Sequence, residues 1–175
     1  MKTHTLLNLH KLRNKYGHAV FGKIVQKLLA LSFRDIGYDH IVERSVEGVD
    51  IDVAEKDGGK FAVEVKTTEG QSISLSRDNI RSLKQRARDG YVPIVAALRI
   101  AIFENWIISK IPINELSAGQ FLIDRLRAYR MNSIENPMRN SFEQVMEKHF
   151  EGALKNGQRY LNEQLRHTGI EVRDA

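Results

Sequence analysis

The chain contains no cysteine, and this absence removes several classes of site at once. A disulfide-stabilised scaffold, a thiolate zinc site and a cysteine nucleophile are all excluded. The sequence also lacks a run of the roughly 18 apolar residues that a membrane-spanning helix needs. Residues 1–5 carry charge without a long apolar segment after it, unlike a secretory signal. We therefore expect an intracellular, cytoplasmic protein that has no membrane partner.

Other common catalytic signatures are missing as well. No G-x-x-x-x-G-K-[ST] loop is present, so no nucleotide cofactor is expected, and no G-x-S-x-G elbow marks a serine hydrolase. The six histidines are scattered and never stand at the spacing of paired metal ligands. With 42% hydrophobic residues in 175, the chain has enough apolar material for one folded domain and a smaller appendage.

Acidic residues are missing from the beginning of the chain, where the first is Asp35. The net charge of +5 resides in residues 1–113, because acidic and basic residues balance over 114–175. Such an excess favours a polyanionic partner such as nucleic acid. The basic residues of this region that we expect to contact a DNA backbone are Lys11, Arg13, Lys15 and Lys23.

Hydrophobic periodicity predicts an α/β core followed by helices. Helices are expected over residues 3–16, 18–36 and 77–89, and strands over 40–44, 49–54, 60–68, 91–98 and 105–108. Beyond Pro112 no strand is evident, and helical patterns cover 115–131, 139–155 and 157–167. We predict a central mixed sheet flanked by helices in residues 1–113. Residues 114–175 form a helical extension that packs on the core or mediates dimerisation.

Two of the predicted strands form a hairpin, turning at residues 55–59, that carries charge on one face. Apolar residues at Val49, Ile51, Val53, Phe61, Val63 and Val65 alternate with Asp50, Asp52, Glu64 and Lys66. Pairing the strands brings Asp50, Glu64 and Lys66 to one polar patch. Two carboxylates suit a hard cation such as Mg²⁺, and a neighbouring lysine can stabilise charge on a phosphate. The alternative is a solvated hairpin face with a salt bridge.

Other charged residues near the hairpin receive smaller roles. Asp52 is expected to be solvated or capped by Lys60 or another neighbour, with help in holding a second metal ion as the alternative. Glu43, Glu47 and Glu69 are expected to be exposed. The helix over 77–89, with Ser76 as its N-cap, carries a basic stripe beside an apolar one. The stripe consists of Arg77, Arg81, Lys84 and Arg88. It is predicted to contact DNA phosphates without reading sequence, and solvated surface charge is the alternative.

The order of elements, with Gly48-Val49-Asp50 on one strand and Glu64-Val65-Lys66 on the next, resembles the PD-(D/E)XK nucleases. Residues 22–113 are most similar to the archaeal-type Holliday junction resolvases in that superfamily. The resemblance implies a restriction-endonuclease-like core in which Asp50, Glu64 and the Val65 carbonyl bind Mg²⁺, with Mn²⁺ able to substitute. It also implies that Lys66 assists the attacking water.

One position departs from the resolvase pattern. The glutamate that resolvases usually carry on the first helix is replaced by Gln26. As a catalytic residue, Gln26 can touch the metal or hold a ligated water, but it supplies no negative charge. The alternative is an ordinary exposed helix residue.

The predicted function is therefore a Mg²⁺-dependent DNA endonuclease, acting on branched or junction DNA in recombination or repair. The resemblance also implies a homodimer, because resolvases cut two strands symmetrically. Two alternatives stay open. One is an Mrr-like restriction or repair endonuclease with the same core, and the other is a nuclease-fold protein that only binds DNA, which Gln26 favours.

Overall fold

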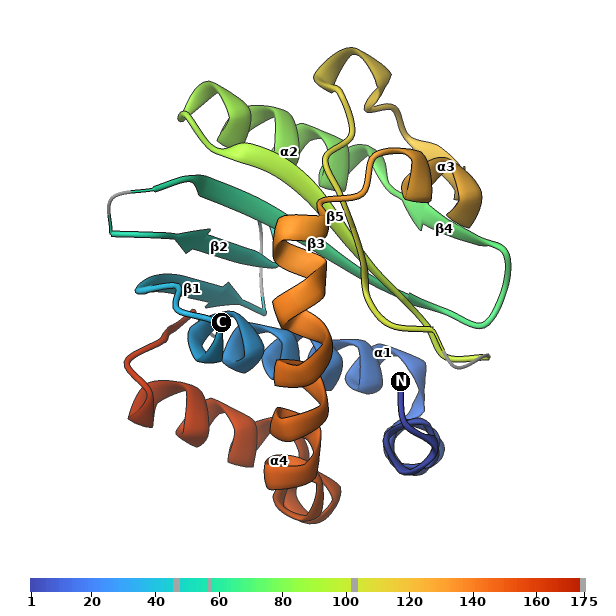
Figure 1. Ribbon diagram of the computed structural model, residues 1–175, viewed down its shortest axis with the longest axis vertical. Coiled ribbons are helices and arrows are strands. Elements are labelled where there is room, and N and C mark those ends of the chain that lie inside the picture. The colour runs from blue at the N-terminus through green and yellow to red at the C-terminus, as the bar shows by residue number, and fades with distance from the viewer. Residues whose placement is uncertain (46–47, 57, 102–103, 174–175) are drawn as a thin grey trace.

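The computed structural model describes residues 1–45, 48–56, 58–101 and 104–173. A six-stranded mixed sheet, with strand order β6-β5-β3-β2-β1-β8, forms the middle of the molecule (Figure 1). Its strands are β1 (His40–Arg44), β2 (Ile51–Ala54), β3 (Lys60–Thr68), β5 (Val92–Arg99), β6 (Ile107–Ser109) and β8 (Glu171–Arg173). A second, two-stranded sheet pairs β4 (Ser72–Leu75) with β7 (Gly119–Leu122).

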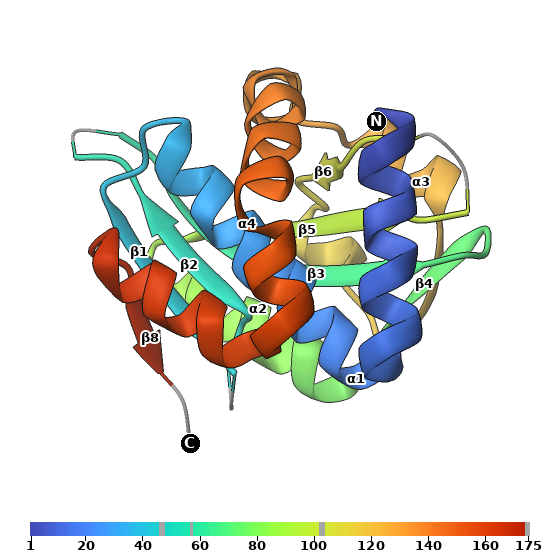
Figure 2. The ribbon, with the colours of Figure 1, turned by 90° about the horizontal axis from the view of Figure 1, so that it is seen from below.

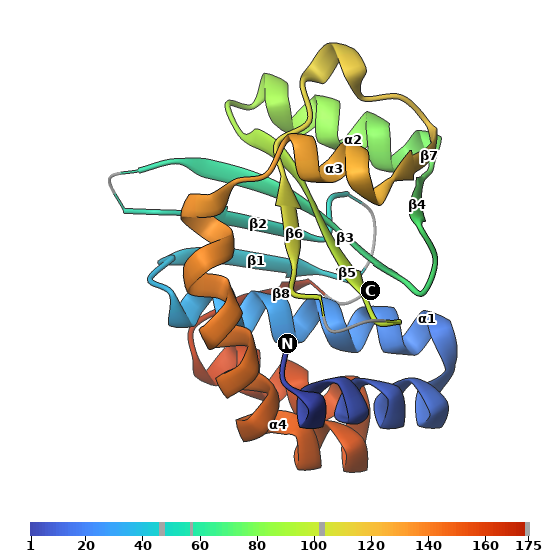
Figure 3. The same cartoon turned by 45° about the vertical axis from the view of Figure 1, so that its right-hand side comes forward.

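Helices cover both faces of the large sheet, as Figure 3 shows. On one face lie α1 (Thr3–Asp35) and α4 (Asn132–His167), and on the other lie α2 (Arg77–Arg88) and α3 (Ile123–Ala128). Each face has its own hydrophobic cluster, one containing Val63 and Val65 and the other containing Ala62. Alternate residues of β3 therefore supply the two clusters, as the period of a strand requires. The predicted α/β architecture, a central mixed sheet flanked by helices, is confirmed.

The helix α1 is bent into a hairpin at Gly17, where φ is 72° and ψ is 172°. Its first half packs along α4, and its second half lies against the sheet (Figure 2). Glu143 of α4 accepts hydrogen bonds from the backbone N–H of Lys2 and the hydroxyl of Thr5. The N-terminal segment is thus fixed to the C-terminal part of the chain. Among the described residues, no helix is both long and apolar enough to cross a bilayer.

Most of the elements predicted before residue 113 are confirmed. The helix α2 begins with a capping box. Ser76 Oγ accepts a hydrogen bond from the Asn79 N–H at 3.1 Å, and the Asn79 side chain accepts one from the Ser76 N–H at 2.9 Å. The hairpin between β2 and β3 pairs Ile51 with Val63. Its turn is closed by a bond from the Glu55 N–H to the Gly59 carbonyl, while Asp57 lies outside the described residues.

The predicted C-terminal helical extension is present as the long helix α4, but the expectation that no strand follows residue 113 is wrong. Residues 115–131 contain β7 and the short helix α3, after a 3₁₀ turn η1 (Ile113–Glu115). The helix α4 is also continuous through Pro137 and bends at Gly157, rather than breaking near Pro137. Finally, β8 adds to the edge of the large sheet, parallel to β1.

The missed strands β4, β7 and β8 are each three or four residues long. Each pairs with a segment distant in sequence, so local periodicity carries little trace of them. The strand predicted over 49–54 also begins later than expected, at Ile51.

Candidate active site

The candidate site lies where β3 extends beyond its neighbour β2. Pairing of the two strands ends at Ile51 and Val63, so the later residues of β3 have no β2 partner. Asp50 occupies the space that this leaves, and its Oδ2 accepts a hydrogen bond from the backbone N–H of Val65 at 2.8 Å. Because the N–H and C=O of one strand residue point to the same side, the Val65 carbonyl is directed towards Asp50 as well.

Glu64 and Lys66 project from the same face of β3. Lys66 Nζ lies 2.7 Å from Glu64 Oε1. The structure thus brings together Asp50, Glu64, Val65 and Lys66, as the hairpin pattern suggested, although Asp50 stands just before β2 rather than within it. Val49 also leaves the predicted alternation, since it packs in the cluster on the α2 side while Ile51 packs on the α1 side.

The Glu64 carboxyl group is almost completely removed from water, with an exposed fraction of 1%. Burial, and secondly the negative charge of Asp50, raise the pKa of Glu64 to about 7, against the opposing charges of Lys66 and Lys23. Its second oxygen, Oε2, is buried without a hydrogen-bond partner. A buried carboxylate oxygen without a partner is costly, and a cation placed beside it would remove that cost.

A cavity of about 440 Å³ opens next to this cluster. It is lined by His18, Ala19, Gly22, Lys23, Gln26, Asp50, Val65, Lys66 and Thr67. Its α1 wall follows the spacing of one helix face, from Ala19 through Gly22 and Lys23 to Gln26. Lys23 and Gln26 are three residues apart, so helical periodicity in the sequence could have predicted that they lie side by side on α1.

Lys23 and Gln26 reach Asp50 from α1. Lys23 Nζ lies 3.4 Å from Asp50 Oδ1 and donates to Gln26 Oε1 at 3.1 Å. Gln26 is not an exposed helix residue, because only 2% of it is accessible. Its amide nitrogen donates to the backbone carbonyl of Asp50 at 3.1 Å.

Two acidic residues near the site were predicted only in part or wrongly. Asp52 is capped by neighbouring side chains, as one form of the expectation had it, but these are arginines and not Lys60: Arg86 of α2 binds it through Nε at 3.0 Å and Nη2 at 2.7 Å, and Arg44 lies 2.6 Å away. Glu43, expected to be exposed, is fully buried. Two arginines are needed here because Asp52 projects into a layer between sheet and helix, where water cannot solvate it.

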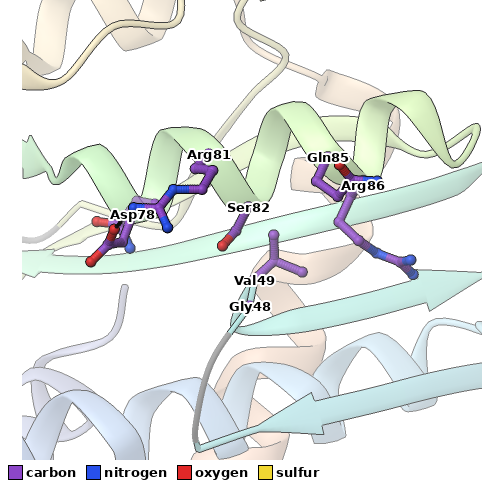
Figure 4. A pocket seen from close by; sticks show the side chains of 8 residues that line it. Gly48, Val49, Asp78, Arg81, Ser82, Gln85 and Arg86 are labelled. Atoms are coloured by element: carbon purple, nitrogen blue, oxygen red, sulfur yellow. Dashed lines mark hydrogen bonds and ion pairs between the residues drawn. The ribbon is translucent and has the colours of Figure 1, made fainter.

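A second cavity, of about 650 Å³, separates α2 from the residues that precede β2. Figure 4 shows the side chains of Arg81, Ser82 and Arg86 on α2, with Gly48 and Val49 opposite them. The remaining lining residues are Asp78, Asn79 and Gln85.

The basic residues predicted to contact DNA fall into two groups on opposite sides of the sheet (Figure 3). On α2, Arg77, Arg81 and Arg88 are exposed and Lys84 is half-buried. On the first half of α1, Lys11 lies over the ring of Phe150, Lys15 donates to the carbonyl of Leu154 at 2.6 Å, and Arg13 pairs with Glu69. Glu69 is exposed as expected, and Glu47 lies outside the described residues.

Within the described residues, no three His, Asp or Glu side chains gather as a metal site. Two carboxylates, Asp50 and Glu64, with the Val65 carbonyl are the donors that this cluster offers. That set fits Mg²⁺, which is commonly held by one or two carboxylates and keeps water or phosphate as its other ligands.

No family model matches the chain, and no curated protein matches it. Among solved structures, the chain is similar to the Holliday junction resolvase Hjc of Archaeoglobus fulgidus, with a TM-score of 0.50. The chain has the fold of that resolvase. The two sequences are 17% identical over the matched part, which covers 62% of this chain and 89% of Hjc. At this identity the likeness establishes the fold, and the chemistry must be argued from the residues of the site.

Proposed function

We propose that this chain is a metal-dependent endonuclease that hydrolyses phosphodiester bonds in DNA. The observation that carries the proposal is the buried carboxylate of Glu64, which has an unpartnered oxygen beside Asp50 and Lys66. Two negative groups held together away from water require a cation to remain ionised. A cation between two carboxylates, with a lysine alongside, is suited to an anionic phosphate substrate.

Asp50, Glu64 and the carbonyl of Val65 would hold Mg²⁺, or Mn²⁺ in its place, as in the PD-(D/E)XK nucleases that the sequence resembles. When bound, the ion supplies Lewis acidity that neutralises the phosphate and lowers the pKa of a water molecule. Lys66 acts as a point charge that stabilises the negative charge developing on the phosphate. Lys23 balances Asp50 when no metal is bound, and it lines the same cavity as Lys66.

The substrate we propose is branched DNA, with the four-way junction as its first example, because the fold is shared with a junction resolvase. The exposed arginines of α2 and the basic residues of α1 hold the DNA backbone by sequence-independent contacts. Cutting a junction symmetrically requires two sites, so we propose that the active form is a homodimer working in DNA recombination or repair.

A second candidate is a protein that binds DNA through the same fold without cutting it. The observation that favours it is Lys23, whose ammonium group already neutralises Asp50 at 3.4 Å. If that ion pair persists in the DNA complex, Asp50 is not free to accept a metal ion.

A cleavage assay with Mg²⁺ or Mn²⁺ distinguishes these possibilities. The substrates are a four-way junction and linear, methylated and flapped duplexes of the same sequence. Selective cutting of the junction, lost in Asp50→Ala and Lys66→Ala while binding is largely retained, supports the proposal. Preferential cutting of methylated or linear DNA indicates an Mrr-like enzyme, and binding without cutting by the wild type indicates the second candidate.

A further inference from the structure

A buried polar cluster lies directly behind the candidate site, between α1 and β1. The side chains of Lys27 and Glu43 are both 0% exposed, and Lys27 Nζ lies 2.8 Å from Glu43 Oε2. Lys27 also donates to Ser45 Oγ at 2.9 Å. An ion pair this deep is tolerated only when its remaining hydrogen-bonding capacity is satisfied.

Gln26 supplies part of that capacity. Its Nε2 lies 2.6 Å from Glu43 Oε1, 2.6 Å from the Arg44 carbonyl and 3.1 Å from the Asp50 carbonyl. All three neighbours are acceptors, so the amide nitrogen must point inwards, with its two hydrogens shared among them. The amide oxygen is then left to face Lys23.

We infer that Gln26 is a positioning residue for Asp50 and not a metal ligand. Through one amide nitrogen it ties the end of β1 and the start of β2 to α1. The Asp50 carbonyl accepts a second bond, from the Arg44 N–H at 2.9 Å, and its carboxylate is held by Val65. Asp50 is thereby fixed from both its backbone and its side chain, and Gln26 makes the link that comes from the helix. The importance of this for catalysis rests on the function proposed above.

The same contacts explain why glutamine stands where resolvases usually carry glutamate. A carboxylate at position 26 would face the Glu43 carboxylate and two backbone carbonyls, with no hydrogen to offer any of them. Lys27 already pairs with Glu43, and Lys23 would reach only the carboxylate oxygen of residue 26 that faces it. Glutamate at position 26 is therefore incompatible with glutamate at position 43, and the two positions are coupled.

Thermal unfolding of metal-free protein, at pH 8 with a chelator, tests the inference without any need for activity. We expect Q26E to lower the Tm by about 5–10 °C, because it places a second carboxylate against Glu43 and two carbonyl oxygens while Lys23 reaches only its other oxygen. In the E43Q background, Q26E should lower the Tm clearly less than it does in the wild-type background, because the opposing carboxylate of Glu43 is gone. Q144E, at an exposed position of α4, is the matched control and should change the Tm by less than about 2 °C.

A Mg²⁺ titration of the same variants, followed by Tm, separates positioning from ligation. A positioning role predicts that Q26E does not bind Mg²⁺ more tightly than the wild type. The inference is overturned if Q26E leaves the metal-free Tm unchanged and raises the Mg²⁺ affinity, or if E43Q fails to reduce the cost of Q26E. If the wild type neither cuts DNA nor binds Mg²⁺, the proposed function fails, but the metal-free comparison still decides whether positions 26 and 43 are coupled through their buried contact.

Discussion

The carboxylate of Asp50 accepts a hydrogen bond from the backbone N–H of Val65, 15 residues later in the chain, at 2.8 Å. This bond joins the residue before β2 to the part of β3 that carries Glu64 and Lys66. It places the two carboxylates close enough for the charge of one to raise the pKa of the other. The predictions below depend on that arrangement.

Glu64→Gln is expected to stabilise the metal-free protein at high pH. The pKa of Glu64 is raised from 4.5 to about 7 in the folded state, so the folded protein holds this proton more tightly than the unfolded chain does. The resulting contribution to the free energy of unfolding is fully present below pH 4.5 and is lost as pH rises through 7. The shift corresponds to a penalty of about 3 kcal/mol above pH 7, which glutamine does not incur. Urea unfolding between pH 5 and 8 should show the difference between the variant and the wild type growing with pH. Glu147→Gln, at an exposed position of α4, is the control, and a pH-independent difference would contradict the assignment.

Lys23→Met is expected to increase the affinity for Mg²⁺ while weakening DNA binding. Lys23 lies 3.4 Å from Asp50 Oδ1 and competes with a metal ion for that carboxylate. A partly exposed ion pair of this kind contributes up to about 1 kcal/mol, so the gain should be about two- to fivefold. The rise of Tm with Mg²⁺ concentration measures it. Weaker Mg²⁺ binding in the variant would show that Lys23 supports the metal site instead of opposing it.

Gly22→Ala should raise stability, and Gly22→Leu should reduce activity without unfolding the protein. Gly22 lies inside α1 with ordinary helical geometry, and a Cβ built there meets nothing within 4 Å. Alanine gains about 1 kcal/mol over glycine in a helix, or about 2–4 °C in Tm for a chain of this size. Leucine at this position projects into the cavity shared with Asp50 and Lys66, so cleavage should fall about tenfold or more.

Val20→Leu is the control for Gly22→Leu, since Val20 is on the same helix but does not line the cavity. Unchanged cleavage by Gly22→Leu would mean that the DNA does not approach this wall of the cavity.

Arg86→Ala and Arg81→Ala should affect different properties, although both arginines lie on α2 and line the same cavity. Arg86 forks onto the buried Asp52 and stacks on the ring of Tyr91 at 3.8 Å, so its loss should cost about 1–3 kcal/mol, with Arg44 limiting the damage. Arg81 pairs with the exposed Asp78, so its loss should cost less than about 0.5 kcal/mol. DNA binding should respond to Arg81 and show a shallower salt dependence. A stability loss equal for both variants would contradict the distinction.

Asp52 shows why part of the site could not be predicted from local pattern. Strand alternation placed Asp50 and Asp52 on one face, but Asp50 stands before the strand begins and is held by Lys23 from α1. Asp52 points to the other layer and is held by Arg86 of α2. Period-two reasoning requires regular strand geometry, and the chain leaves that geometry one residue before Ile51.

Gln26 and Glu43 illustrate the same limit in three dimensions. The sequence alone identified the element order up to residue 113 apart from β4, the period-two face of β3 with Glu64 and Lys66, and the N-cap of α2, because each depends on neighbouring residues. Only the tertiary structure decided that Gln26 and Glu43 are buried together, that α4 holds the first half of α1, and that β8 completes the sheet beside β1. These features depend on contacts between segments that are distant in sequence. The burial and ion pairing that stabilise them arise only when folding brings those segments together, so the local sequence pattern does not reveal them.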